Sequence, residues 1–162
     1  MPNTSRTGAP PAGALVVLLA LAGVGDLSAW QNSGPPLVTD RPDQTESAVV
    51  VPRGWAQLEV GNAHASGGGS KLFNLGAALL RLGIARPVEL RLGFAGWQRA
   101  EPDGAPAVDG VGDLDLGAKL VLREGSGLSP AVAVMGSLTL PTGHEAFRAS
   151  GPDPTIRASL SH

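Results

Sequence analysis

Long stretches of this chain alternate strictly between large apolar residues and polar or small ones. Val88–Trp97 is the clearest case, with Leu90 and Leu92 on one side and Glu89 and Arg91 on the other. Successive side chains of a β-strand point to opposite faces, which gives a period of two. An amphipathic helix would repeat apolar residues at i, i+3, i+4 and i+7, and charges would then fall inside its apolar stripe. The pattern predicts an all-β protein.

Turn-rich segments separate the predicted strands, as at Gly67–Gly69, Ala85–Pro87 and residues 124–130. Residues 98–111 carry Pro, Gly and Asp and are predicted to form a loop. Residues 30–54, rich in Pro, Asp, Ser and Thr, are expected to form an extended lead-in. We expect strands near residues 55–64, 73–84, 88–97, 113–122 and 131–140, and the start of another near 155–160.

The first 29 residues have the features of a secretory signal peptide. Arg6 is the only charged side chain before the apolar run Ala14–Gly25. A transmembrane helix needs about 20 apolar residues, so this run is too short to span a bilayer but suits a signal-peptide core. Leu27-Ser28-Ala29 supplies a small residue at the cleavage position. We expect a signal-peptide helix within residues 1–29; the alternatives are a short buried helix and an uncleaved anchor.

An exported chain of alternating strands favours an antiparallel up-and-down outer-membrane β-barrel over residues 55–162. Transmembrane strands need about 9–11 residues, with one face apolar and the other polar. The composition has no Tyr and only 4% aromatic residues, which counts against the aromatic girdles of such barrels. A soluble sandwich shows similar alternation. The alternative function is therefore a soluble periplasmic β-sheet binding protein.

Charged residues of both signs fall on the polar side of the predicted strands, where they would face the lumen. A network of this kind would set pore polarity, or it would be a set of salt bridges that fills a narrow barrel. Mutual pairing is expected in either case, because buried charges without partners are costly. The candidates are Glu59, Arg81, Glu89, Arg91, Asp115 and Lys119.

Several classes of chemistry find no support in the sequence. The net charge of −2 and the few aromatic residues give no nucleic-acid signal, and the absence of cysteine excludes thiolate chemistry. Gly110-Val111-Gly112 lacks the rest of a phosphate loop. The three histidines lie far apart, and no nucleophile elbow is present. We expect no enzyme activity, no cofactor and no metal.

The stretch Thr39–Ser47, followed by Val51-Pro52-Arg53-Gly54, resembles a bacterial outer-membrane family described as "putative MetA-pathway of phenol degradation" and often called simply "transporter". Three further pieces agree in order and type: Glu89–Gly93, Gly110–Lys119 and Leu140–Gly143. The resemblance implies a barrel in the outer membrane that takes up small hydrophobic or aromatic compounds. Its motif candidates are Asp40, Arg41, Pro42, Asp43 and Glu46.

The acidic residues of this motif lack the spacing of a calcium loop. We expect them to be structural, with Asp40–Asp43 fixing a turn at the periplasmic end and Arg41 pairing with lumen carboxylates. The number of strands raises a separate point. Single-chain bacterial barrels have 8 or more strands, so the five or six predicted here cannot close. We expect the sequence to be the N-terminal part of a barrel, or a subunit that closes with partners.

Overall fold

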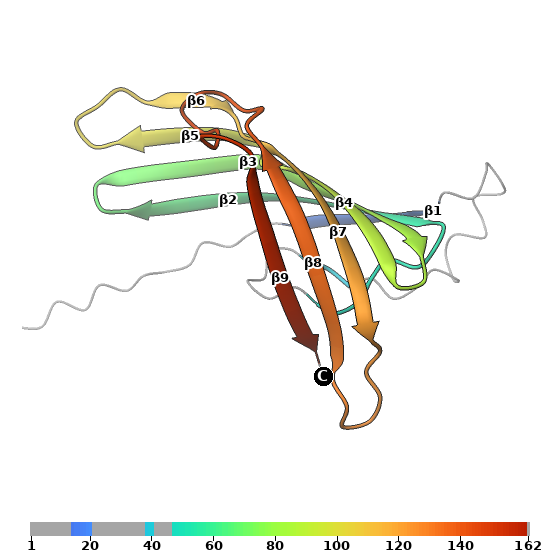
Figure 1. Ribbon diagram of the computed structural model, residues 1–162. Coiled ribbons are helices and arrows are strands. Elements are labelled where there is room, and N and C mark those ends of the chain that lie inside the picture. Colours follow the sequence, from blue (N-terminus) through green and yellow to red (C-terminus); the bar gives the residue numbers. More distant parts are fainter. Residues whose placement is uncertain (1–13, 21–37, 41–46, 162) are drawn as a thin grey trace, which may run out of the picture.

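The computed structural model describes residues 14–20, 38–40 and 47–161, and this described part contains strands, turns and irregular segments but no helix. All strand pairs are antiparallel and belong to one nine-stranded sheet (Figure 1). The strands are β1 (Ala14–Ala20), β2 (Trp55–Gly67), β3 (Ser70–Ala85), β4 (Val88–Phe94), β5 (Trp97–Pro102), β6 (Val108–Val111), β7 (Leu114–Arg123), β8 (Ala131–Leu140) and β9 (Asp153–Ser161).

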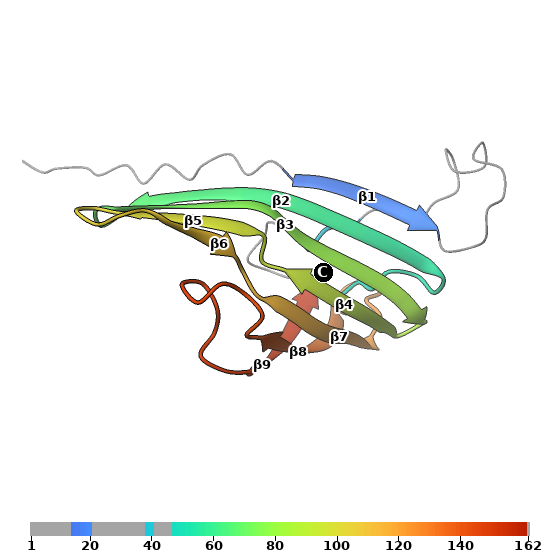
Figure 2. The same ribbon diagram turned by 90° about the horizontal axis from the view of Figure 1, so that it is seen from above.

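The main path of the sheet runs β1-β2-β3-β4-β7-β8-β9, so that neighbours in space are mostly neighbours in the chain. The sheet twists and bends along this path, and β8 and β9 are turned well away from the direction of β2 and β3 (Figures 1 and 2). β1 and β9 are the two ends of this path, β6 is a further edge beside β5, and the sheet of the described residues does not close. The prediction of an all-β, up-and-down antiparallel sheet that forms part of a barrel is confirmed.

The predicted strand at 88–97 is wrong in one respect, because it is two strands. β4 ends at Phe94 and β5 begins at Trp97. Between them Gly96 has a φ of +83°, and an added Cβ there would lie 2.5 Å from the Leu75 carbonyl oxygen. β3 is long enough to pair with both strands, first with β5 through Ser70–Leu75 and then with β4.

The predicted loop at 98–111 is mainly a β-hairpin of β5 and β6. Its polar residues and prolines indicated a loop. This hairpin projects past the end of β4 (Figure 1). Its strands can therefore carry polar side chains on both faces without the free-energy cost of burying them.

The predicted signal-peptide helix is also corrected within the described residues. Ala14–Ala20 form β1, which pairs with β2 from Ala14↔Gly61 to Ala20↔Trp55. An edge strand presents unpaired N–H and C=O groups, and an apolar segment rich in Val and Leu readily pairs with such an edge. The rest of residues 1–29 lies outside the described residues, so the cleavage expected before Trp30 stays a prediction.

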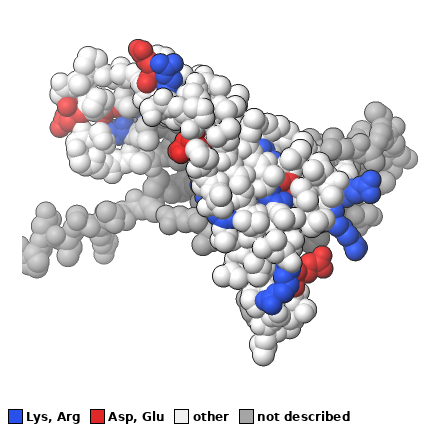
Figure 3. All heavy atoms as spheres, viewed as in Figure 1, with Lys and Arg blue, Asp and Glu red and all other residues white. Residues whose placement is uncertain are grey.

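The two faces of the sheet have reversed polarity relative to a soluble protein. One face carries rows of leucines that are exposed, including Leu92 (44%) and Leu116 (43%). The opposite, inner face carries charged side chains that are buried, including Arg81 (0%) and Lys119 (1%). Figure 3 shows a surface that is mostly uncharged over the strands. The charges lie inside, and the apolar side chains lie outside.

A non-strand segment, the inner segment (residues 38–40 and 47–52), covers the buried charges of the inner face. Ala48 and Val51 of this segment are buried. Its approach to β3 is very close: a Cβ added at Gly83 would lie 2.0 Å from the Pro52 carbonyl oxygen and 2.4 Å from that of Val51. Only glycine leaves room for the inner segment at this point of β3.

Replacing Gly83 by alanine is therefore expected to push the inner segment off β3. The added methyl meets backbone atoms, so we expect a loss of about 1–3 kcal/mol in the free energy of unfolding. Gly136→Ala is the matched control, because the added methyl would meet nothing within 4 Å. Urea titration of both variants measures the difference in unfolding free energy. Equal losses in the two variants would contradict the close approach of the inner segment to Gly83.

Candidate functional site

Strand register brings charged residues from four strands together on the inner face. Arg81 on β3 lies directly across from Arg91 on β4, and Glu89 on β4 lies across from Lys119 on β7. Glu59 on β2 pairs with Leu79 on β3, which lies two residues before Arg81 on the same face. Because every second residue of a strand points to the same face, these side chains share one side of the sheet. We call them, together with Asp40, the ionic cluster.

Arg81 holds the cluster together. Its Nε and Nη2 donate to the two oxygens of Glu89 at 2.8 and 2.9 Å, and its Nη1 donates to Glu59 Oε1 at 3.2 Å. Arg91 Nη1 also donates to Glu89 Oε1, at 2.9 Å. Glu89 therefore lies between two guanidinium groups that would otherwise repel each other across the strand pair. Bidentate contacts of this kind are among the stronger ion pairs in proteins.

Asp40 completes the cluster from the inner segment. Its Oδ2 accepts hydrogen bonds from Lys119 Nζ at 2.5 Å and Arg91 Nη1 at 2.6 Å, and it lies 3.4 Å from Arg81 Nη2. Its Oδ1 accepts hydrogen bonds from the backbone N–H and hydroxyl of Ser47 at 3.1 and 3.0 Å. Burial would raise the pKa of Asp40, but Arg81, Lys119 and Arg91 outweigh it and lower this pKa to about 2.

The same charged groups also bind the backbone of the inner segment. Arg81 donates to the carbonyl oxygens of Val38 and Val49, at 2.7 and 3.1 Å, and Lys119 Nζ donates to that of Ser47 at 3.0 Å. The Val51 N–H donates to Glu89 Oε2 at 2.7 Å. These contacts satisfy polar groups of the segment, which has no strand partner to do so.

At its far side the inner segment reaches β9. The Ser159 hydroxyl donates to the Ser47 carbonyl oxygen at 3.4 Å, and the Ala48 N–H donates to Ser161 Oγ at 3.3 Å. Near β2, Gln57 Nε2 donates to the Val38 carbonyl oxygen at 3.0 Å. The described residues of the inner segment thus contact strands at both sides of the inner face, from β2 to β9, and the ionic cluster lies beneath them.

Five of the six predicted lumen candidates meet in this cluster: Glu59, Arg81, Glu89, Arg91 and Lys119. Asp115 does not. It lies farther along β7 and accepts a hydrogen bond from the Thr139 hydroxyl at 3.2 Å.

Among the motif candidates, Asp40 was expected to help fix a turn at the periplasmic end. In the structure it contacts strand side chains on the inner face. Arg41, Pro42, Asp43 and Glu46 lie outside the described residues.

A carboxylate that the sequence did not single out, Asp113, joins two of the quoted motifs. Its Oδ1 accepts from the Gly143 N–H at 2.8 Å and its Oδ2 from the Ala149 N–H at 2.7 Å. A Cβ at Gly143 would lie 2.9 Å from Asp113 Oδ1, so glycine is needed there. The sequence signal near Asp113 was Gly112, just before a predicted strand. This glycine indicated a turn but gave no information on the contacts of Asp113.

The described residues contain no group of three or more His, Cys, Asp and Glu that could hold a metal ion. Two of the histidines lie against aromatic rings. The ring centroids of His64 and Phe73 are 4.6 Å apart, and those of His144 and Phe147, in the loop after β8, are 6.4 Å apart. In the same part of the chain, no helix is long and apolar enough to cross a membrane.

A family model matches most of the chain. The family model described as "Putative MetA-pathway of phenol degradation" matches residues 39–161, which include Asp40 and every strand from β2 to β9. The chain belongs to this family. The resemblance noted from the motifs is confirmed. All residues of the ionic cluster lie within the matched residues 39–161. No curated protein and no solved structure matches the chain.

Removal of Arg81 tests the central position given to it. Arg81→Met leaves Glu89 and Glu59 buried with fewer partners, and we expect a loss of about 3–5 kcal/mol in the free energy of unfolding. Arg99→Met is the control, because the pair of Arg99 with Glu101 is 41% and 36% exposed and should contribute less than about 1 kcal/mol. Similar losses in urea titrations of the two variants would refute the assignment.

The low pKa of Asp40 predicts an acid-sensitive contribution to stability. The carboxyl titrates near 3.8 when unfolded and near 2 when folded. The folded state thus favours the ionised form, so the contribution of about 2 kcal/mol is complete above about pH 5 and is lost progressively as the pH falls through 3.8 and then through about 2. The measurement is the difference in unfolding free energy between the wild type and Asp40→Asn. A difference that stays constant from pH 6 to pH 2 would contradict it.

Proposed function

We propose that this chain forms part of an outer-membrane β-barrel that admits small hydrophobic or aromatic molecules, and that residues 1–29 direct its export and are then cleaved off, which would remove β1 and leave β2 as an edge. One observation supports this above all others: the charged face of the sheet is buried while the leucine face is exposed. In water this arrangement is unfavourable, because apolar area gains stability by leaving the solvent. Against lipid, with a polar lumen inside, it is favourable.

The position of the covering segment argues against the soluble alternative. A soluble sandwich would pack a second layer on the apolar face of the sheet. Here the inner segment lies on the charged face, and it does so through side chains that need polar partners. The exposed leucines have no cover among the described residues. A bilayer is the partner that suits this face.

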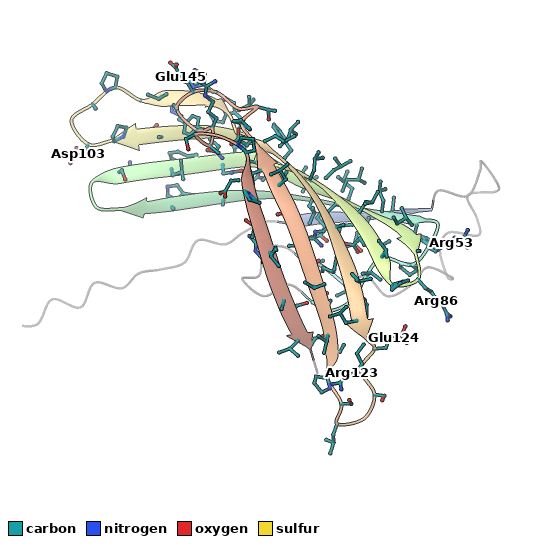
Figure 4. All side chains as sticks on the ribbon, viewed as in Figure 1. Arg53, Arg86, Asp103, Arg123, Glu124 and Glu145 are labelled. Atoms are coloured by element: carbon teal, nitrogen blue, oxygen red, sulfur yellow. The ribbon has the colours of Figure 1, made fainter. Side chains whose placement is uncertain are left out.

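Strand length and the placement of turns also suit a membrane. β7 and β8 have ten residues each, which at ~3.3 Å per residue and a tilt of ~40° span about 25 Å, the height of the apolar band of such barrels. Figure 4 places the labelled charges at the turns, with Arg86 and Arg123 at one end and Asp103 and Glu145 at the other.

The connections at the two ends of the sheet differ in how far they extend. At one end β3 is joined to β4 by residues 86–87 and β7 to β8 by residues 124–130, whereas at the other end the β2–β3 and β5–β6 hairpins extend past β4 and residues 141–152 join β8 to β9. Outer-membrane barrels have short periplasmic turns and longer extracellular loops. We therefore orient Arg86 toward the periplasm.

The solute class rests on the description of the family, which links it to phenol degradation. A channel for aromatic compounds would supply such a route with its starting material, and a catalytic role is not part of the proposal. The direct test is whether the chain fractionates with outer membranes, migrates differently on gels before and after heating, and lets phenol enter vesicles. Recovery of the cleaved protein in the soluble periplasm would overturn the proposal in favour of the soluble alternative.

A charged substitution on the leucine face can show whether this face contacts lipid or water. Leu116 lies in the interior of the apolar rows, between Leu92 and Leu138. Leu116→Arg should cost about 2–4 kcal/mol in a bilayer, whereas an exposed position in water would tolerate it within about 0.5 kcal/mol. Leu128→Arg, at a turn where the side chain is 92% exposed, is the control. Urea titration in vesicles measures both, and a neutral Leu116→Arg would contradict a lipid-facing surface.

A further inference from the structure

The surroundings of Asp40 have the form of an occupied anion site. Three cationic side chains from three adjacent strands, Arg81, Arg91 and Lys119, converge on one oxygen of its carboxylate. We propose that these cations are a binding site for the carboxylate group of a small monocarboxylate solute, and that Asp40 occupies this site as an internal carboxylate. The inference rests on the proposed function, since the solute has to reach the site through the lumen.

The site is built into the sheet, whereas its occupant is not. Arg81 is held in place by the bidentate contact with Glu89, which also contacts Arg91, and all three residues lie on paired strands. Asp40 comes from the inner segment. The hydrogen bonds that join residues 38–40 and 47–51 to the strands all use a strand side chain as one partner. Departure of these described residues therefore breaks no strand ladder.

Charge balance defines the replacement. When Asp40 leaves, the cluster holds one negative charge fewer than in the intact protein, and an uncompensated buried charge is costly. A monocarboxylate restores the same charge and the same acceptor oxygens. A neutral phenol or alcohol cannot do so, since it lacks the charge.

The residues around the cations suit an apolar remainder on such a solute. Met135 on β8 lies across from Lys119, and Leu79 on β3 lies across from Glu59. Both side chains are buried on the inner face, as is Val51 of the inner segment. A carboxylate attached to an aromatic or short aliphatic group fits this combination of cations and apolar neighbours better than a polar anion such as sulfate.

Displacement of the inner segment is measurable because the chain has no cysteine. Ala48 is 2% exposed and follows Ser47, which binds Asp40. In Ala48→Cys, we expect benzoate to raise the rate of labelling by a membrane-impermeant maleimide several-fold over chloride at equal ionic strength. Benzyl alcohol should have no effect. Leu128→Cys, exposed at a turn, is the control whose labelling should not respond. Equal rates in benzoate and chloride would overturn the inference.

A second variant provides an independent readout should Ala48→Cys fail to fold. In Asp40→Ala the site is vacated, and acetate or benzoate should raise the temperature at which the folded band disappears on gels, relative to chloride. Asp103→Ala removes an exposed carboxylate at the tip of the β5–β6 hairpin and is the matched control. An equal rise in both variants, or none in Asp40→Ala, would overturn the inference.

The two proposals fail in different ways. A barrel that is heat-modifiable and admits phenol into vesicles, yet shows no response to carboxylates in either variant, keeps the proposed function and overturns the anion site. Recovery of the chain as a soluble periplasmic protein overturns both. A carboxylate response in a membrane-embedded barrel supports both.

Discussion

The ion pair between Arg81 and Glu89 is the interaction on which the inner face depends. Both side chains are fully buried, and each binds the inner segment as well as its partner. Without the pair, Arg91 would lie beside Arg81 with no carboxylate between them. Such a pair does not guarantee high stability, because removing two charges from water is costly. It does specify one arrangement of β3, β4 and the inner segment.

The relation between the two faces explains how the rest of the fold is arranged. A sheet with leucines outside and charges inside has no conventional hydrophobic core to hold its layers together. Polar contacts to the inner segment take that place, and the apolar part of the interior is small: its buried residues include Ala48, Val51, Leu79, Ala133 and Met135. The membrane, in the function proposed above, supplies the apolar surroundings that a second protein layer would supply in water.

Strand alternation predicted most of this architecture. Glu59, Arg81, Glu89, Arg91 and Lys119 could be assigned to one face because a period of two leaves no choice, and the register between strands then brought them together. Asp115 shares their face but lies too far along β7 to reach the cluster. Alternation predicts which face a residue is on, but not its position along the strand relative to residues of other strands. Asp40 could not be placed, because a segment without periodicity gives no information on where it packs. The break at Gly96 was missed since its cause lies in β3.

The contacts of Asp40 have a consequence for how the chain assembles. Asp40 and Lys119 are 79 residues apart, and Ser47 and Ser159 are 112 apart. Contacts of such separation form late, because the closure of long loops has to precede them. In the function proposed above, Lys119 and Arg91 would lack one anion in the assembling barrel until Asp40 arrives. Coupling of bilayer insertion to docking of the inner segment would then let the chain supply this counter-charge itself as the strands pair.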